Sequence, residues 1–204
     1  MCKMIKNVIF DLGNVLLKFQ PKEFLLRFTD DAEYIEQFIA KIFRSNIWIN
    51  LDRGTTSLEN AKDDFVSKYS KEKDFLTLFF NHWMEMLTPI EENIEILKNL
   101  RNIGYKTYIL SNFIRETYTF IEKKYDIFSL FEGQIISGRE NVIKPEKAIY
   151  KLLLNRFSLI PEESLFIDDV LHFLKPAKKL GIKTIWNRPE TDLREELKKF
   201  DIIL

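Results

Sequence analysis

The sequence predicts an α/β protein in which a parallel β-sheet is flanked by helices and an all-helical segment is inserted after the first strand. From residue 89 onward, short apolar runs alternate with amphipathic helical patterns. Strands that alternate with helices in this way form parallel sheets covered on both faces. Between residues 17 and 88, large apolar side chains recur at helical spacing and no convincing strand pattern is present. We therefore expect two units, one formed by residues 1–16 and 89–204 and a helical one formed by residues 17–88.

The first strand is expected at Val8–Phe10, because these β-branched and aromatic residues are too few for a helix of ordinary length. Gly13-Asn14 then supplies residues typical of a turn. Between them lies Asp11. A carboxylate at the end of a buried strand is costly unless it is paired, bound to a metal or exposed at the sheet edge, where ligands of open α/β sheets bind. Asp11 is therefore the first candidate functional residue.

The segment from Pro21 to Thr88 is predicted to be helical. Ser57 is a candidate N-cap for a helix that runs to about Tyr69. We expect Trp48–Thr56 to be a loop between helices, and its residues 52–56 could close over a site on the sheet and exclude water. The apolar residues at helical spacing, which we expect to form a core, are Phe24, Leu25 and Phe28, then Ile35, Phe38, Ile39 and Ile42, then Phe75, Phe79, Trp83 and Met86.

The remaining elements alternate along the chain. Strands are expected at Lys106–Leu110, Gly133–Ser137, Ser164–Ile167 and Lys183–Trp186. Helices are expected at Glu91–Ile103, after Ser111-Asn112 to about Tyr125, from a first turn containing Pro145 to about Phe157, after Asp168-Asp169 to Leu180, and from about Asp192. Gly104 and Gly181 are placed to end two of these helices, and Gly138–Lys144 is expected to be a polar loop.

Composition excludes several classes of protein. Lys and Arg together number 31, as do Asp and Glu, so no net charge attracts nucleic acid or an anionic membrane. The single cysteine, Cys2, excludes an intramolecular disulfide and is typical of a reducing compartment. The apolar run before Asp11 is too short for a signal peptide, and no apolar stretch approaches the roughly 20 residues of a membrane span. We expect a cytoplasmic monomer or homodimer whose partner is a small molecule, not nucleic acid or a membrane.

Polar residues follow three of the predicted strands: Asp11, Ser111-Asn112 and Asp168-Asp169, with Lys144 in the loop after another strand. Carboxyl ends of parallel strands share one edge of the sheet, so these side chains can meet. Three clustered carboxylates would not all ionise without a cation, and oxygen ligands favour Mg²⁺. The sequence therefore predicts a magnesium site at this edge.

A metal, a lysine and a hydroxyl around one carboxylate form a site for phosphoryl transfer. Asp11 would attack phosphorus, and water would hydrolyse the aspartyl phosphate. Mg²⁺ and Lys144 would offset charge on the phosphoryl oxygens, which Ser111 and the amide of Asn112 would orient. This chemistry predicts a Mg²⁺-dependent phosphatase that acts on a small phosphorylated metabolite.

Four segments follow one another at these strand ends: Phe10–Leu16, Ile109–Asn112, Ile143–Glu146 with Ile149-Tyr150, and Phe166–Asp169. Together they resemble the four ordered motifs of the haloacid dehalogenase superfamily, in the branch of small bacterial sugar-phosphate phosphatases and the phosphatase half of epoxide hydrolases. The resemblance implies a Rossmann-like catalytic core with a helical cap at residues 17–88, and a sugar phosphate as substrate. It also implies roles for single residues: Asp11 as nucleophile, Ser111 and Asn112 at the phosphate, Lys144 as the stabilising charge, and Asp11, the Gly13 carbonyl, Asp168 and Asp169, directly or through water, as Mg²⁺ ligands.

Two departures from the superfamily pattern stand out, one at Gly13 and one at Phe173 and Pro176. Gly13 stands where most of its phosphatases have a second aspartate that protonates the leaving group, an effect typically worth ~10²–10⁴-fold in rate. Phe173 and Pro176 stand where the branch usually has Asn and Gly, which puts the role of Asp169 in doubt more than that of Asp168. A leaving group that departs easily, such as an anomeric sugar hydroxyl, would suffer least from the loss at Gly13.

Alternatives remain open from the sequence. A dehalogenase would displace halide from carbon without Mg²⁺, and a phosphate-binding protein would have lost turnover together with its acid. Arg53 could reach a substrate hydroxyl or phosphate, or be an exposed surface arginine. His82 and His172 are possible replacement acids, although the helical pattern around His82 favours a structural role. Asp11, Lys144, Ser111-Asn112 and Asp169 each also have a purely structural interpretation as cap, turn or solvated residues.

Overall fold

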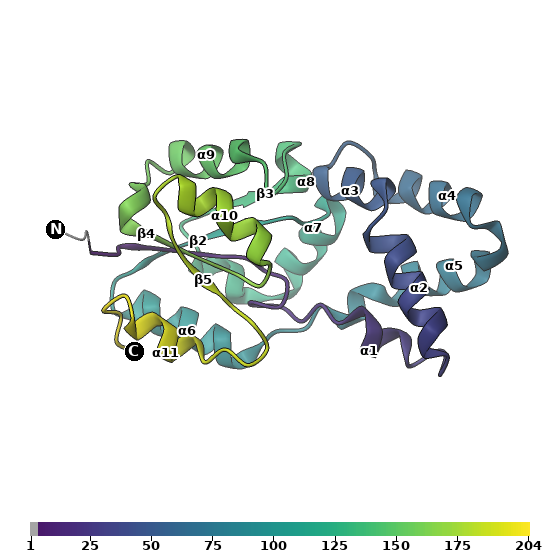
Figure 1. Ribbon diagram of the computed structural model, residues 1–204, viewed down its shortest axis with the longest axis horizontal. Helices are drawn as coiled ribbons and strands as arrows, with labels where there is room; N and C mark the ends of the chain where they lie inside the picture. The colour runs from purple at the N-terminus through teal and green to yellow at the C-terminus, as the bar shows by residue number, and fades with distance from the viewer. Residues whose placement is uncertain (1–3) are drawn as a thin grey trace.

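A computed structural model of the protein, which describes residues 4–204, contains a five-stranded parallel sheet flanked by helices (Figure 1). The strands are β1 (Asn7–Phe10), β2 (Lys106–Ser111), β3 (Gly133–Ile136), β4 (Ser164–Asp168) and β5 (Lys183–Trp186). They lie in the order β3-β2-β1-β4-β5, which puts β1 in the centre. The predicted α/β fold is confirmed, and Cys2 lies outside the described residues.

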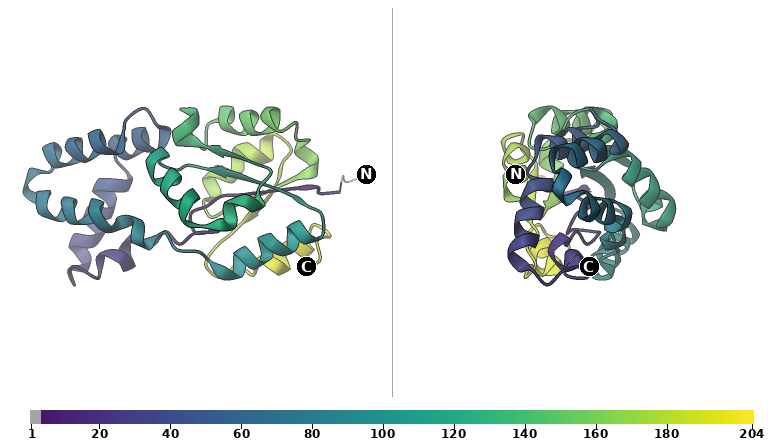
Figure 2. Two further views of the ribbon diagram at one scale, coloured as in Figure 1. Left: turned by 180° about the vertical axis from the view of Figure 1, so that it is seen from behind. Right: turned by 90° about the vertical axis from the view of Figure 1, so that its right-hand side faces the viewer.

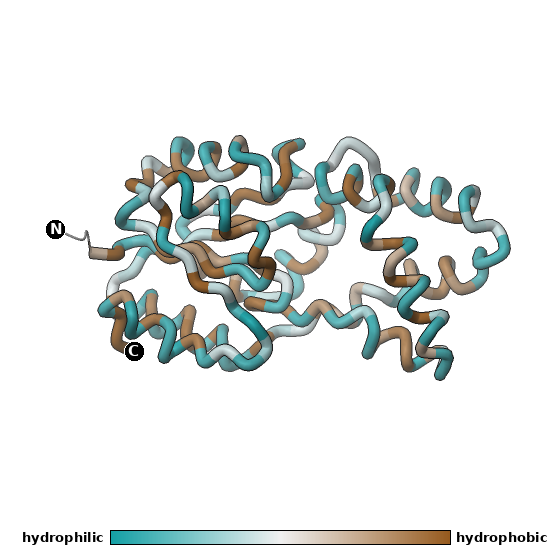
Figure 3. The backbone as a smooth tube through the Cα atoms, viewed as in Figure 1, coloured by the Kyte–Doolittle hydropathy of each residue, from teal (hydrophilic) through white to brown (hydrophobic). Residues whose placement is uncertain are grey.

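Alternate strand residues face opposite sides of the sheet. Val8 and Phe10 pack into one hydrophobic core, and Ile9 between them packs into the other. Apolar residues thus run along the strands, which lie between two helical layers (Figure 3). Because both faces of the sheet are buried, the strands appear in the sequence as short continuous apolar runs. The first face is covered by α6 (Glu91–Asn102), α7 (Arg115–Lys124) and α11 (Leu193–Lys198), and the second by α9 (Lys147–Arg156) and α10 (Leu171–Lys179) (Figures 1 and 2).

The segment between β1 and α6 is helical, as its apolar spacing predicts. It contains α1 (Pro21–Leu25), α2 (Ala32–Phe43), α3 (Asn46–Arg53), α4 (Leu58–Lys68) and α5 (Lys73–His82), with short 3₁₀ helices at Ser70–Glu72 and Trp83–Met86. Two more 3₁₀ helices, Asp126–Leu130 and Pro161–Glu163, lie in the sheet-containing part of the chain. Phe38 and Phe79 are fully buried with their rings 5.5 Å apart at 71°, an edge-to-face arrangement that stabilises an aromatic core. These helices lie beyond one end of the sheet (Figure 1).

The prediction of a loop at Trp48–Thr56 is wrong, because most of this stretch is helix α3. The Ser45 hydroxyl accepts a hydrogen bond from the Trp48 N–H at 3.1 Å, and Gly54 ends the helix at a φ of 82°. Trp48 and Leu51, one turn apart, are both buried. An N-cap, a left-handed glycine and two buried apolar side chains together determine a helix despite its short length.

Two smaller expectations after β3 also differ. Part of the expected polar loop forms α8 (Ser137–Glu140), which Asn141 ends in the left-handed conformation at a φ of 56°. Helix α9 begins at Lys147 and not at Pro145. The Glu146 N–H donates to the Ile143 carbonyl at 2.9 Å, so a turn precedes the helix and Pro145 lies within that turn.

Two chain segments, residues 12–20 and 87–90, connect the helical segment to the sheet. They are hydrogen-bonded to each other: the Lys18 N–H donates to the Thr88 carbonyl at 2.8 Å, and the Ile90 N–H donates to the Leu16 carbonyl at 2.9 Å. Within residues 4–204, none of the helices combines the length and apolarity needed to cross a membrane.

Candidate active site

The carboxyl ends of the strands meet at the edge of the sheet that faces the helical segment (Figure 1). Parallel pairing sets Phe10 of β1 opposite Ile167 of β4, so the next residues, Asp11 and Asp168, lie side by side. The Asp11 N–H continues the ladder by donating to the Ile167 carbonyl at 2.9 Å. Asp11 is 6% exposed and Asp168 is fully buried. The sheet therefore holds two adjacent carboxylates at its centre.

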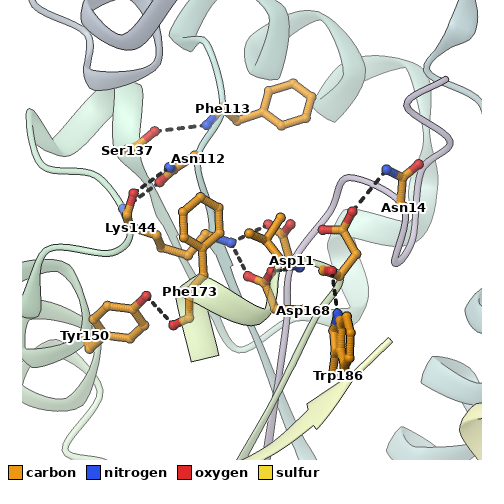
Figure 4. Close-up of polar contacts among 12 residues, drawn as sticks. Asp11, Asn14, Asn112, Phe113, Ser137, Lys144, Tyr150, Asp168, Phe173 and Trp186 are labelled. Atoms are coloured by element: carbon orange, nitrogen blue, oxygen red, sulfur yellow. Dashed lines mark hydrogen bonds and ion pairs between the residues drawn. The ribbon is translucent and has the colours of Figure 1, made fainter. Parts of the chain in front are cut away.

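Lys144 lies between these carboxylates (Figure 4). Its Nζ is 2.9 Å from Asp11 Oδ1 and 2.5 Å from Asp168 Oδ2, and the side chain is 1% exposed. Burial disfavours its charged form, but the two carboxylates outweigh burial and raise the pKa of Lys144 above its ordinary value. Lys144 is therefore a buried cation.

Asn112 holds the Lys144 backbone on both sides (Figure 4). Its Oδ1 accepts from the Lys144 N–H at 2.7 Å, and its Nδ2 donates to the Lys144 carbonyl at 3.0 Å. This pair ties the end of β2 to the loop before α9. The Asn112 side chain thus positions the lysine, which leaves its backbone amide as the group that could contact a ligand.

A third carboxylate, Asp169, completes an acidic cluster with Asp11 and Asp168, in which ligand oxygens of the three residues lie within 4.8 Å of one another. Burial raises the pKa of Asp168 to about 7, opposed by Lys144, and burial together with the Asp11 charge raises the pKa of Asp169 to about 6. One lysine cannot neutralise three carboxylates. A cluster of oxygen ligands with excess negative charge suits a divalent cation such as Mg²⁺.

Asn14 orients Asp169. Its Nδ2 donates to Asp169 Oδ2 at 3.1 Å, while its Oδ1 accepts from the Phe19 N–H at 3.0 Å. Asn14 adopts a positive φ of 50°, which asparagine tolerates better than most residues. The Trp186 indole donates to the Asp169 carbonyl at 2.8 Å, so both the side chain and the backbone of Asp169 are held.

Asp11 and Asp169 of this cluster line a pocket of about 210 Å³. Its polar lining includes Asp11, Gly13, Asn112, Lys144 and Asp169. Its walls are largely apolar and come from Phe19, Trp48, Trp83, Leu87, Phe113, Ile114, Val170 and Phe173. A larger hollow of about 510 Å³ lies at the opposite edge of the sheet, beside the first residues of β1 and β2 and away from the acidic cluster.

Other residues singled out from the sequence lie as follows. Ser111 is buried at the end of β2 and, among the described residues, is not part of the pocket lining. Arg53 forms a bidentate ion pair with Glu146, at 3.0 and 2.6 Å. His82 is exposed and contacts Glu85 through Nδ1 at 2.7 Å. His172, the other histidine considered as a replacement acid, is also exposed.

Phe173, one of the two departures from the superfamily pattern, covers the lysine. Lys144 Nζ lies 5.0 Å from the centroid of the Phe173 ring, within the range of a cation–π contact. The Phe173 carbonyl accepts from the Tyr150 hydroxyl at 2.6 Å. Pro176 lies inside α10.

Three residues of the helical segment contribute to the pocket in ways that the sequence did not fully predict. Trp83 is a core residue as expected and also lines the pocket, and Trp48, which was expected in a loop, is buried on α3 and lines the pocket as well. Asp52 was expected in a loop that could close over the site; it does line the pocket, but it lies on helix α3. The signal available for Asp52 was its position four residues after Trp48 between an N-cap and a terminal glycine, which places both side chains on one helical face.

The sequence was also compared with protein families and with individual known proteins. A family model described as haloacid dehalogenase-like hydrolase matches residues 5–181. The chain is 36% identical over 204 residues to a glyceraldehyde 3-phosphate phosphatase of Pyrococcus furiosus, covering 90% of this chain and 81% of that protein. It is 23% identical over 197 residues to drimenol cyclase drtB of Aspergillus calidoustus, where it covers 95% of this chain but spans only 36% of that longer protein.

A solved structure has a similar fold. The HAD family enzyme BT-2542 of Bacteroides thetaiotaomicron, in complex with magnesium and inorganic phosphate, superposes with a TM-score of 0.75 at 23% identity. The match covers 94% of this chain and 98% of that one.

Proposed function

The chain belongs to the haloacid dehalogenase-like hydrolase family, and we propose that it is a Mg²⁺-dependent phosphatase that hydrolyses a small phosphate monoester. One observation carries the proposal: the buried Lys144 pairs with Asp11 and Asp168, Asp169 completes their acidic cluster, and Asp11, Lys144 and Asp169 line one pocket. The phosphatase activity of a 36% identical relative supports it.

Asp11 would be the nucleophile. One carboxylate oxygen of Asp11 attacks phosphorus, the bond from phosphorus to the ester oxygen breaks, and an aspartyl phosphate forms. Water then attacks the phosphorus and releases inorganic phosphate and Asp11. The fixed position of Asp11 beside Asp168, with Lys144 Nζ at 2.9 Å, supports this role because it holds the attacking group in place.

Lys144 would stabilise charge on the phosphoryl oxygens, with the Asn112 amide and Ser111 as further phosphate contacts. The side chains of Asp11, Asp168 and Asp169 and the Gly13 carbonyl would hold Mg²⁺, which supplies positive charge to the phosphoryl group when bound.

The helical segment, residues 17–88, would act as a cap that selects the substrate. It contributes Phe19, Trp48 and Trp83 to the pocket walls. A sugar phosphate is the substrate predicted from the sequence, and a direct Arg53 contact to it would require opening the ion pair with Glu146. Because the walls are mainly aromatic and aliphatic, monoesters with an apolar organic group belong to the same panel of candidates.

The test is phosphate release with Mg²⁺ from a panel of sugar phosphates, apolar alkyl phosphates and an aryl phosphate, comparing the wild type with Asp11→Asn. We expect turnover that requires Mg²⁺ and disappears in the variant. Halide release from a haloacid without Mg²⁺ would instead favour the dehalogenase alternative. Metal-dependent binding of phosphate without turnover of any ester would identify a binding protein.

A further inference from the structure

Position 13 offers no proton donor in this site. Gly13 lines the pocket without a side chain, and a Cβ added there would meet nothing nearer than the Phe19 Cβ at 4.0 Å. The space beside Gly13 is therefore open. Cleavage of an alkyl phosphate leaves a strongly basic alkoxide, so a proton must come from elsewhere in the pocket.

We propose that Asp52 of α3 protonates the leaving-group oxygen and later accepts a proton from the attacking water, an inference that rests on the proposed phosphatase function. Among the described residues that line the pocket, Asp52 is the one titratable side chain outside the cluster of Asp11, Lys144 and Asp169. Asp52 comes from the helical segment and Asp11 from the carboxyl end of β1, and both line the same pocket.

The position of Asp52 is determined by contacts between α3 and the sheet-containing unit. The Ser137 hydroxyl donates to the Asp52 carbonyl at 2.6 Å, and Arg115 Nη2 donates to the Gly54 carbonyl at 3.3 Å. The neighbouring Arg53 pairs with Glu146. The last turn of α3 is therefore anchored at successive residues, which fixes where the Asp52 carboxyl lies.

The surroundings of Asp52 keep a large share of its carboxyl protonated near neutral pH. Burial raises its pKa to about 7, and the Asp11 charge adds to the rise. The Trp48 indole, which donates a hydrogen bond to the carboxylate, and the Lys144 ammonium oppose it. An acid with a pKa near the working pH has both the proton to donate and the ability to take it back.

The two steps then balance. In the first, the phosphorus bond to the ester oxygen breaks as Asp11 attacks, and the Asp52 proton passes to that oxygen, so a neutral alcohol leaves. In the second, the Asp52 carboxylate takes a proton from the water that attacks the aspartyl phosphate. The bond from phosphorus to Asp11 breaks, and both residues return to their starting states.

The test is the dependence of Asp52→Asn on the leaving group. We would measure kcat/KM with Mg²⁺ for the best alkyl phosphate of the panel and for 4-nitrophenyl phosphate, whose leaving group departs without a proton. We expect a loss of roughly 10²–10⁴-fold on the alkyl ester and less than about tenfold on the aryl ester. Asp64→Asn, an exposed aspartate on α4, is the matched control and should change neither rate.

Equal losses on both esters would overturn the proposal, because they would indicate a structural role, and so would an unchanged alkyl rate. Either result leaves the phosphatase function intact. Wild-type turnover of the aryl ester alone would also refute proton donation by Asp52. Only a wild type that hydrolyses no ester would remove the phosphatase function as well.

Discussion

Substituting Gly54 by alanine tests the docking of α3 on α8. Gly54 has a φ of 82°, and a Cβ added to it would lie 2.2 Å from the Gly138 carbonyl oxygen. Both obstacles involve backbone, so no side-chain rotation relieves them. The left-handed conformation costs an alanine roughly 1–2 kcal/mol. Overpacking adds about 1–3 kcal/mol, unless α3 moves away from α8.

Gly104→Ala is the matched control. Gly104 has a φ of 95° and nothing within 4 Å of an added Cβ, so it carries the conformational cost without the clash. We expect urea unfolding to show a loss of about 1–2 kcal/mol for Gly104→Ala and about 2–5 kcal/mol for Gly54→Ala. The difference between the two variants isolates the contact between the helices.

Kinetics provide the second measurement on Gly54→Ala. If α3 relieves the clash by separating from α8, it breaks the hydrogen bond from Ser137 to the Asp52 carbonyl and displaces the Asp52 carboxyl. Alkyl phosphate turnover should then fall more than aryl phosphate turnover. Equal stability of Gly54→Ala and Gly104→Ala, with unchanged kinetics, would refute the close approach of the two helices.

Three further predictions concern charge. Lys144→Met leaves two buried carboxylates without their cation, so chemical denaturation in metal-free buffer should show a loss of about 3–5 kcal/mol, and a loss below about 1 kcal/mol would contradict the buried pair. Mg²⁺ at 100 times its dissociation constant should raise the melting temperature by roughly 5–11 °C, an effect that Asp168→Asn should remove if the cluster binds the metal. Arg53→Met and Glu146→Gln should each lower the free energy of unfolding by about 0.2–1 kcal/mol, and the double variant should lose no more stability than either single variant. A large rise in KM for Arg53→Met, without one for Glu146→Gln, would instead indicate that Arg53 contacts the substrate.

A pH prediction follows from Asp52. Because its pKa is raised to about 7, its proton-donating form is depleted as pH rises through that value. The kcat for an alkyl phosphate should therefore fall above about pH 7, whereas the kcat for an aryl phosphate should not fall with the same midpoint. Discontinuous assays of phosphate release with Mg²⁺, from about pH 5.5 to about pH 9, measure kcat for both esters. Identical pH profiles for the two esters would contradict the assignment of Asp52 as proton donor.

Local signals were enough to predict the strand ends and the cluster they form. Asp11, Asp168 and Lys144 follow buried strands or precede a helix, and parallel topology brings such positions together without further information. Helix α3 was missed because its length is short and its cap, Ser45, and terminal Gly54 were not read as a pair. A bidentate contact such as Arg53 to Glu146 joins residues 93 positions apart and has no local signature.

The two connections to the helical segment have a consequence for how this protein can be altered. Because Lys18 is hydrogen-bonded to Thr88, the chain leaves the sheet-containing unit and returns to it at one place. From the point of view of the sheet, the seventy or so residues between them form a closed loop, and loop closure depends only weakly on length. A different helical insert could be spliced between Lys18 and Thr88 while the acidic cluster stays in place. Such an exchange would replace the pocket walls in one continuous piece of the gene, but it would also remove Asp52, so a new insert would have to bring its own proton donor.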